Sequence, residues 1–423
     1  MEAKKVFEVI EGRADRLAGM LSDIIRIDTS VPPGDGYARM VEYLEPLLKA
    51  AGLETERVVV PEERWRSIPL PLEGERVNLV ARWAAAGKPP ASIYAHMDVV
   101  PAGDGWTVDP FGGEISAGKV FGRGAIDMKG SIPPAVVAFE VMRELGLEPA
   151  FEASLLLCTD EETGVDPGAA YLAELGYFKP PIIHLEGGGQ APAMISANAG
   201  CLKAVITVTG REVHSGLGFL GINAIEESIP VMEELMELKR EVEKRESVFD
   251  SFPLAGMPSP RLTPTFNINM MRAGEKLNMV PARSELQIDR RYLPDEDPAE
   301  VKSEMARAVE RARERSRAER IDIDFEVIYP PHSIDTESEH VRRWCDGVRL
   351  ALGYPADLPF IFPAATGATD MSFVGKIAGT DQFVGTGVMD AEHLGAHEAD
   401  ESVPVANLVH LCQELVYFLC GLD

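Results

Sequence analysis

The sequence of 423 residues predicts an α/β fold: a discontinuous domain, with a mostly parallel sheet flanked by helices, that is interrupted by an inserted domain. Two observations lead to this prediction. Apolar runs of strand length alternate with amphipathic helix patterns before residue 200 and again after residue 330. Between those positions the strand and helix patterns follow each other in a different order. We therefore expect three segments, residues 1–199, 200–330 and 331–423, of which the first and third form one domain.

The first segment opens with an amphipathic helix over residues 1–27. A second helix over residues 37–51 follows a turn built by Pro32, Pro33 and Gly34. Strands and helices then alternate, and the strands are apolar throughout, as in a parallel sheet buried on both faces. The expected strands cover residues 54–60, 77–83, 92–99, 153–159 and 181–185, and the expected helices cover 129–145 and 167–175.

The inserted segment begins with the strand LKAVITVTG and a long charged helix over residues 223–246. Two strands, TPTFNINMM and SELQIDRRYL, a helix over residues 298–317 and the strand IDIDFEVIY complete it. The order β-α-β-β-α-β is that of the ferredoxin-like split unit, so this segment is expected to fold as a domain. A helix over residues 337–352, the strand QFVGTG and a closing helix then return to the first domain.

The composition excludes several classes of partner. A net charge of −27 argues against nucleic acid or an anionic membrane, because both attract basic surfaces. Charged residues interrupt the amphipathic N-terminal helix, so it does not read as a signal sequence, and no later stretch is long and apolar enough to span a bilayer. The five cysteines lack paired zinc-ligand spacing. We therefore expect a cytoplasmic protein with reduced thiols.

Histidine and carboxylate side chains follow successive strands. His96 and Asp98 lie in HMDVVP, at the end of one apolar strand. Asp160, Glu161 and Glu162 lie in DEETG, at the end of another. Asp127 lies between them in the glycine-spaced run VFGRGAIDMKG, just before a helix. Each acid taken alone could be a helix cap, but sites in open α/β sheets form at the carboxyl ends of strands, so we expect these clusters to converge.

These residue types suit a site for divalent metal ions. Two such ions lying close together need a carboxylate that bridges them, and Asp127 fits that role. His96 is a candidate ligand, and Asp98 is placed to hold the orientation of its imidazole. Glu161 and Glu162 are adjacent at a strand end, where successive side chains point in opposite directions. We therefore expect one of them to bind metal and the other to act as a general base on water.

Several motifs, in this order and with the inserted domain, resemble the di-zinc aminoacylase/carboxypeptidase family. They are HMDVVPAGDGW, GRGAIDMKG, DEETG, REVHSG, Asn278 with Pro281 followed by Asp289 and Arg291, and His397 with Glu401. Members of that family include acetylornithine deacetylase, succinyl-diaminopimelate desuccinylase, aminoacylase and glutamate carboxypeptidase. The resemblance covers nearly the whole chain.

The resemblance implies a role for each site residue. Asp127 would bridge two zinc ions, with His96 and Glu186 on one and Glu162 and His397 on the other. Cobalt or manganese are alternatives to zinc. Glu161 would be the base, and the inserted domain would be a lid that joins two chains into a homodimer. On that lid His214 would meet the substrate carbonyl, in cis or in trans. Asn278 and Arg291 would hold the substrate carboxylate, and Gly367 and Thr369 would also receive it.

Two alternatives remain open among the ligands. The family usually has Gly-Glu-Pro-Thr/Ser where this chain reads HLEGGGQ, so His184 competes with Glu186. His393 competes with His397, although only His397 lies four residues before an acid.

The activity implied is hydrolysis of the amide bond of an N-acyl amino acid. The alternative is a dipeptidase or carboxypeptidase that acts on a short peptide with the same two metals. A metal-binding protein without catalysis is a third reading, and the presence of a candidate for every ligand and for the base weighs against it.

Overall fold

A computed structural model of the chain describes residues 2–163, 167–189, 191–252, 259–389 and 395–422. The chain divides into two units. The first unit consists of Met1–Ser196, Ile334–Phe362 and Phe373–Asp423, and the second of Ala197–Ser333 and Pro363–Ser372.

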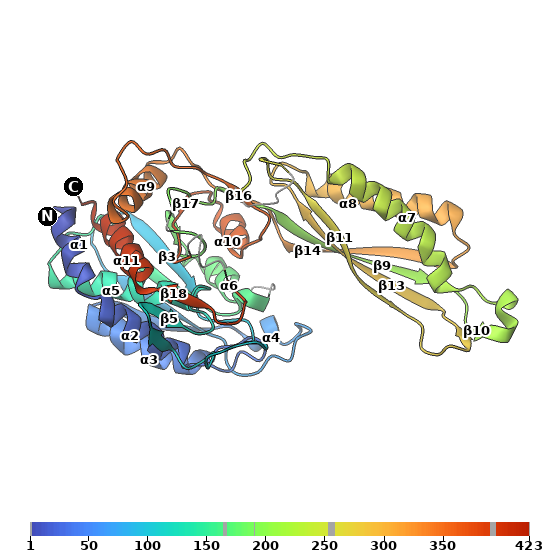
Figure 1. The fold of residues 1–423 in the computed structure, drawn as a ribbon, viewed down its shortest axis with the longest axis horizontal. Helices are drawn as coiled ribbons and strands as arrows, with labels where there is room; N and C mark the ends of the chain where they lie inside the picture. Colours follow the sequence, from blue (N-terminus) through green and yellow to red (C-terminus); the bar gives the residue numbers. More distant parts are fainter. Residues whose placement is uncertain (1, 164–166, 190, 253–258, 390–394, 423) are drawn as a thin grey trace. The chain divides into compact units, whose positions relative to one another are not determined.

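The first unit is a mixed α/β fold (Figure 1). Its central sheet has the strand order β1-β2-β6-β3-β7-β17. Strands β6, β3, β7 and β17 run parallel, whereas β1 and β2 form an antiparallel edge. Residues 60–76, which include a four-residue helix, connect β1 to β2. The strands are β1 (Glu54–Val59), β2 (Val77–Trp83), β3 (Pro90–His96), β6 (Glu152–Cys158), β7 (Ile182–His184) and β17 (Phe383–Val384).

The single N-terminal helix predicted from the sequence is wrong, since two helices occupy that stretch. Helix α1 (Ala3–Glu11) ends at Gly12, and α2 (Ala14–Ile25) starts after Arg13. Glycine is among the poorest helix formers, and the break lets both short helices bury their apolar sides.

Helices cover the sheet and one another in the first unit. Helix α5 (Ile132–Glu144) is buried along most of its length and packs against α2, α3 (Tyr37–Ala51) and the closing helix α11 (Val405–Cys420). Helix α11 also packs against α9 (Glu339–Ala351), as Figure 1 shows. The remaining helices are α4 (Glu62–Trp65), α6 (Ala169–Glu174), α10 (Met371–Ala378), η1 (Lys129–Ser131) and η2 (Glu161–Thr163).

A small antiparallel sheet of order β18-β5-β4 connects two distant parts of the first unit. Strand β18 (Ser402–Pro404) pairs with β5 (Lys119–Phe121), which also pairs with β4 (Glu114–Ser116). This pairing anchors the segment after His397 beside the segment that leads to Asp127.

The second unit is an antiparallel sheet of order β11-β13-β9-β14 with two helices on one face (Figure 1). Its main elements run β-α-β-β-α-β along the chain, and apolar side chains alternate toward the helices to form its core. They are β9 (Gly200–Thr209), α7 (Ala224–Val242), β11 (Thr265–Ala273), β13 (Arg283–Tyr292), α8 (Pro298–Arg315) and β14 (Arg320–Tyr329). The shorter elements are β8 (Ala197–Asn198), β10 (Val213–His214), η3 (Ser215–Leu220), β12 (Met279–Val280), β15 (His332–Ser333) and β16 (Ala364–Ala365).

Among the described residues, every helix is too short or too polar to cross a lipid bilayer.

Candidate metal centre

The parallel strands β6, β3 and β7 are neighbours in the sheet, and each ends near a candidate ligand. His96 is the last residue of β3, and β7 ends at His184. Strand β6 ends at Cys158, two residues before the acidic run that begins at Asp160. Since parallel strands present their carboxyl ends on one side, the sheet explains why these side chains gather.

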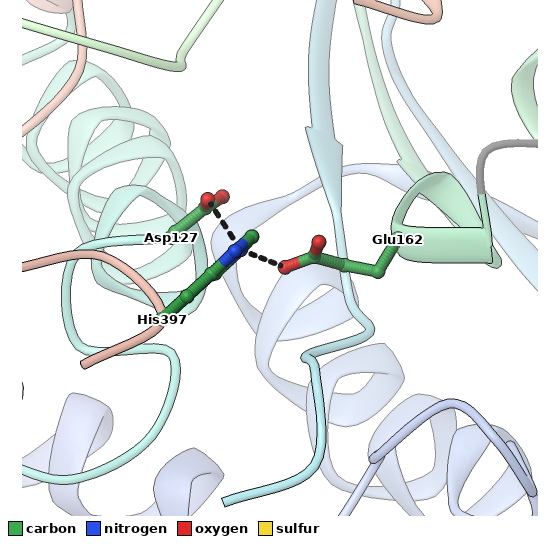
Figure 2. Close-up of side chains that lie close together, drawn as sticks. All are labelled: Asp127, Glu162 and His397. Carbon is green, nitrogen blue, oxygen red and sulfur yellow. Dashed lines mark hydrogen bonds and ion pairs between the residues drawn. The ribbon is translucent and has the colours of Figure 1, made fainter. Parts of the chain in front are cut away.

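Asp127, Glu162 and His397 form a group suited to a metal ion within the part of the chain that the structure describes. One potential ligand atom from each lies within 4.8 Å of the other two. Figure 2 shows the imidazole of His397 between the two carboxylates. Its Nε2 lies 3.0 Å from Glu162 Oε1 and 3.3 Å from Asp127 Oδ2.

His96 approaches the same aspartate from the other side. Its Nε2 lies 3.1 Å from Asp127 Oδ1, and its Nδ1 lies 3.1 Å from the carbonyl oxygen of Asp98. A carbonyl oxygen only accepts hydrogen bonds, so Nδ1 carries a proton and Nε2 faces Asp127. The two oxygens of Asp127 thus face two different imidazoles, as a carboxylate that bridges two metal ions requires.

Asp98 contacts both His96 and the backbone of Glu162. The backbone carbonyl of Asp98 makes the 3.1 Å contact with His96 Nδ1, while its carboxylate Oδ1 lies 3.6 Å away. The other carboxylate oxygen accepts a hydrogen bond of 2.9 Å from the backbone N–H of Glu162. Asp98 is fully buried. Its two contacts link the strand that carries His96 to the turn that carries Glu162.

Glu186 contacts His184. Its Oε2 lies 2.8 Å from His184 Nε2, and the His184 ring packs on Tyr94. Neither residue belongs to the group formed by Asp127, Glu162 and His397. The competing His393 lies outside the described residues. Glu161 is half-buried beside Glu162 in the short helix η2.

The electrostatics of the centre are those of carboxylates paired with imidazoles. Hydrogen bonds to Asp127 and Glu162 raise the pKa of His397 to about 10. Burial opposes a charge on His96, but Asp127 and Asp98 outweigh it and raise its pKa well above the usual range. Burial alone would raise the pKa of Asp127, yet His397 and His96 lower it. Without metal, protons on the histidines therefore balance the carboxylates.

The donor set fits divalent ions of borderline softness. Imidazole nitrogen and carboxylate oxygen are the ligands such ions take in proteins, and the carboxylates supply the negative charge that offsets them. A bound ion would replace the Nε2 protons of His96 and His397, since the ligating nitrogen must be deprotonated. The fit thus rests on residue types, proximity and charge together.

A buried ion pair holds two of the ligand segments together. Glu401 accepts hydrogen bonds from Arg123 Nη1 at 2.7 Å and from the backbone N–H groups of Ile126 and Asp127 at 2.7 and 3.2 Å. Arg123 Nη2 in turn donates to the carbonyl oxygen of His397 at 3.2 Å. Both side chains are buried. The pair thus joins the Asp127 segment to the His397 segment.

Sequence reasoning singled out Glu401 as the acid after His397 but missed Arg123. The available signal was an arginine between two glycines, Gly122 and Gly124, in an otherwise apolar run. An arginine in such a place needs a buried acid as its partner.

The other predicted site residues lie in the second unit. His214 pairs with Met279 in the small β10-β12 sheet, which brings it beside Asn278, and both side chains are exposed. Arg291 on β13 forms a double contact with Asp289, from Nε at 3.0 Å and from Nη2 at 3.1 Å.

Gly367 and Thr369 lie in the segment Pro363–Ser372, which belongs to the second unit although it follows that unit in sequence by some thirty residues. The carbonyl oxygen of Gly367 accepts a hydrogen bond from Asn198. Thr369 is buried, and its hydroxyl accepts from the N–H of Met371.

The two imidazoles of His96 and His397 and the two carboxylates of Asp127 and Glu162 thus gather beside the sheet as a candidate centre for divalent metal ions. Comparison with known proteins gives the family. The profile described as peptidase family M20/M25/M40 matches residues 92–420, and the chain belongs to this family. It is therefore an enzyme of the peptidase and amidohydrolase type.

The individual relatives share only a low sequence identity with this chain. A probable succinyl-diaminopimelate desuccinylase from Staphylococcus epidermidis is 26% identical over 399 residues, which cover 91% of this chain and 92% of that protein. Human carnosine dipeptidase 1 has a similar structure, with a TM-score of 0.74 and 17% identity, covering 98% of each chain. A dinuclear metal-binding peptidase of family M20 from Bacillus subtilis gives a TM-score of 0.67 at 14% identity, covering 96% of this chain and 98% of that one. At these identities the structures show a shared fold.

Proposed function

We propose that the protein hydrolyses the amide bond of an N-acyl amino acid with two divalent metal ions. One observation carries the proposal: the two carboxylate oxygens of Asp127 face two different imidazoles, those of His96 and His397. Membership of a family of metallopeptidases and the dinuclear metal site named for the Bacillus subtilis peptidase support it.

The proposed ligands divide between two ions that share Asp127. His96 and Glu186 would hold one ion, and Glu162 and His397 the other. Glu186 would leave its contact with His184 to do so, and His184 remains the competing ligand. Zinc is the first candidate because it takes imidazole and carboxylate equally well, with cobalt and manganese as alternatives. When bound, the ions lower the pKa of water and polarise the substrate carbonyl.

Glu161 is the proposed general base. Its carboxylate takes a proton from the attacking water as the water oxygen forms a bond to the carbonyl carbon. The bond from that carbon to the amide nitrogen then breaks, and the proton passes from Glu161 to the departing amine. Glu162 is the neighbour whose carboxylate already contacts His397, which leaves Glu161 for the proton transfer.

We propose that Arg291 binds the free carboxylate of the substrate, with Asn278, Gly367 and Thr369 as further contacts and His214 at the carbonyl. Asp289 takes one edge of the Arg291 guanidinium, through Nε and Nη2, so Nη1 remains to bind a carboxylate. The contact also supports the simpler reading that Arg291 only pairs with Asp289. Substitution by Lys separates the two, because Lys lacks the planar fork.

The test of the proposed function is a substrate panel. N-acetyl and N-succinyl amino acids, dipeptides and the matching amides without a free carboxylate are assayed with zinc, cobalt and manganese. The proposal expects turnover of the N-acyl amino acids above that of the dipeptides, and a lower preference for the free acid in Arg291→Lys. An unchanged preference in that variant would show that another group binds the carboxylate.

A dipeptidase or carboxypeptidase is the second candidate, since the carnosine dipeptidase shares the fold. Peptides and N-acyl amino acids differ only beyond the bond that is cleaved. Faster turnover of dipeptides in the same panel would select this candidate.

We also propose that the second unit is a lid that joins two chains into a homodimer. Strand β11 lies at the edge of its sheet, and Met270 and Met271 on it are exposed. Helix α7 exposes Ile225, Ile229 and Met236. An exposed apolar edge of this kind supports pairing with a second copy. Light scattering should give twice the chain mass for the wild type and the chain mass for Met271→Lys; a monomeric wild type would contradict the proposal.

A further inference from the structure

We infer that Asp160, held by Tyr37 and Arg76, is a positioning residue for the turn that carries Glu161 and Glu162. The inference rests on the proposed function, which gives that turn a metal ligand and the base. Asp160 was predicted as one of several acids after β6, without a role of its own. Its surroundings in the structure supply that role.

Asp160 is buried together with two polar partners. Its Oδ1 accepts a hydrogen bond of 3.1 Å from the hydroxyl of Tyr37, and the hydroxyl oxygen accepts one of 3.2 Å from the Asp160 backbone N–H. Arg76 Nε lies 3.5 Å from the same Oδ1. All three side chains have no solvent-exposed area, so water cannot substitute for these contacts.

Arg76 is itself fixed in place. Its guanidinium donates to the carbonyl oxygens of Pro33 at 2.8 Å and Gly74 at 3.0 Å. It also stacks over Trp65, with Cζ 4.3 Å from the ring centre. Two loops and the end of helix α4 therefore hold the cation, and the anion that it faces cannot shift without disturbing them.

The backbone of Asp160 needs such an anchor. Its φ is +63°, in the left-handed region that a residue with a side chain enters at a cost. This conformation turns the chain at the end of β6 directly into η2. The N–H of Glu162 then reaches Asp98 Oδ2 at 2.9 Å, and Glu162 Oε1 reaches His397. The anchored residue thus sets where the next two side chains emerge.

A purely structural buried pair would make a different prediction. It would stabilise the fold but leave the affinity for metal unchanged in molecules that remain folded. A positioning residue changes metal affinity and turnover as well, because partners behind metal ligands are worth about 10- to 100-fold in affinity or activity.

Three variants and one control distinguish these possibilities. Asp160→Gly keeps the freedom to adopt a positive φ but removes both contacts, whereas Asp160→Asn keeps the shape and removes the charge. Tyr37→Phe removes the hydrogen bonds from outside the turn, and it decides the question if the Asp160 variants fail to fold. Tyr43→Phe is the control. Tyr43 lies on α3, like Tyr37, and the substitution removes its 2.9 Å hydrogen bond to Asp23.

The measurements are zinc affinity of the metal-free chain by competition with a chelator, thermal unfolding, and kcat and KM at saturating zinc. We expect zinc binding to weaken about 10-fold in Tyr37→Phe and Asp160→Asn and up to about 100-fold in Asp160→Gly, with kcat falling more than KM rises. Tyr43→Phe should match the wild type in both. Wild-type zinc affinity and kcat in Tyr37→Phe and Asp160→Gly, with only a lower unfolding temperature, would overturn the inference. If the wild type hydrolyses none of the panel, zinc affinity still tests the positioning role while the proposed function fails.

Discussion

Asp127 is the residue on which the site depends, because each of its oxygens faces a different histidine. The sequence predicted this role from the buried context of a lone acid in a glycine-spaced run. It could not show the geometry, since His397 lies far along the chain and is held beside Asp127 by the small β18-β5 sheet and the Arg123–Glu401 pair.

The two adjacent glutamates should respond differently to the same substitution. Glu161→Gln is expected to keep zinc and to lower kcat by about 10²- to 10⁴-fold, the usual worth of a positioned base. Glu162→Gln should weaken zinc binding, because its carboxylate lies 3.0 Å from His397 Nε2 in the ligand group. Zinc titration and steady-state kinetics on both variants check this, and equal behaviour would show that the roles are wrongly assigned.

Zinc binding should release protons at neutral pH. Asp127 and Glu162 raise the pKa of His397 to about 10, so its imidazole is protonated at pH 7 and must lose that proton to bind zinc. The apparent zinc affinity should therefore rise as the pH rises toward 10. Calorimetry in buffers of different ionisation enthalpy measures the release, which should be smaller in His397→Ala. A heat of binding that does not depend on the buffer would contradict this account.

At the level of elements, the strand ends were predictable and the supporting contacts were not. Apolar runs and their polar ends located β2, β3 and β6 to within about three residues. The break between α1 and α2 was missed, because a single glycine in an amphipathic pattern does not by itself end a helix. The backbone partners of Glu401 were beyond reach for a different reason, since backbone N–H groups leave no mark in a sequence.

The Arg123–Glu401 pair should matter for both stability and metal binding. Glu401→Gln leaves the buried Arg123 charge uncompensated, and removal of one partner of a buried ion pair costs about 3–5 kcal/mol. The Asp127 and His397 segments should also loosen, with a loss of zinc affinity of about 10- to 100-fold. Glu144→Gln is the matched control, since it breaks an exposed pair with Arg13 and should change stability by less than about 1 kcal/mol.

Denaturant unfolding and zinc titration of the two variants give the answer. Wild-type zinc affinity in Glu401→Gln would show that the pair stabilises the fold without arranging the ligands.

For the whole molecule, alternation of strand and helix predicted the α/β class, and the change of order near residue 200 pointed to a second unit. The sequence did not predict that Pro363–Ser372 belongs to that unit, because the segment joins it through the pairing of β16 with β8. Short two-residue strands of this kind carry no periodic signal.

The stability of the first unit should fall as the pH rises from about 4.5 to about 8. Burial raises the pKa of Glu414 from 4.5 to about 8, although the Thr386 hydroxyl donates to it. Between these values the folded chain keeps a proton that the unfolded chain has lost. The protonated Glu414 therefore contributes fully to the free energy of unfolding below pH 4.5. This contribution is lost toward pH 8, by up to about 1.4 kcal/mol per pH unit.

Glu414→Gln should remove this part of the pH dependence and unfold less readily than the wild type at pH 9. Urea unfolding at several pH values compares the two, with the exposed Glu144→Gln as the control. Identical pH profiles for wild type and Glu414→Gln would contradict the assignment.

If Asp127 bridges two metal ions, each chain binds two of them, so the decisive measurement is the number of zinc ions bound per chain. Elemental analysis after equilibrium dialysis should find two per chain in the wild type and in the exposed control Asp346→Asn, with hydrolysis lost to chelators and restored by zinc. Asp127→Asn should bind both ions far more weakly, because both would lose a shared charged ligand. Two tightly bound ions in Asp127→Asn, or none in an active wild type, would contradict the account.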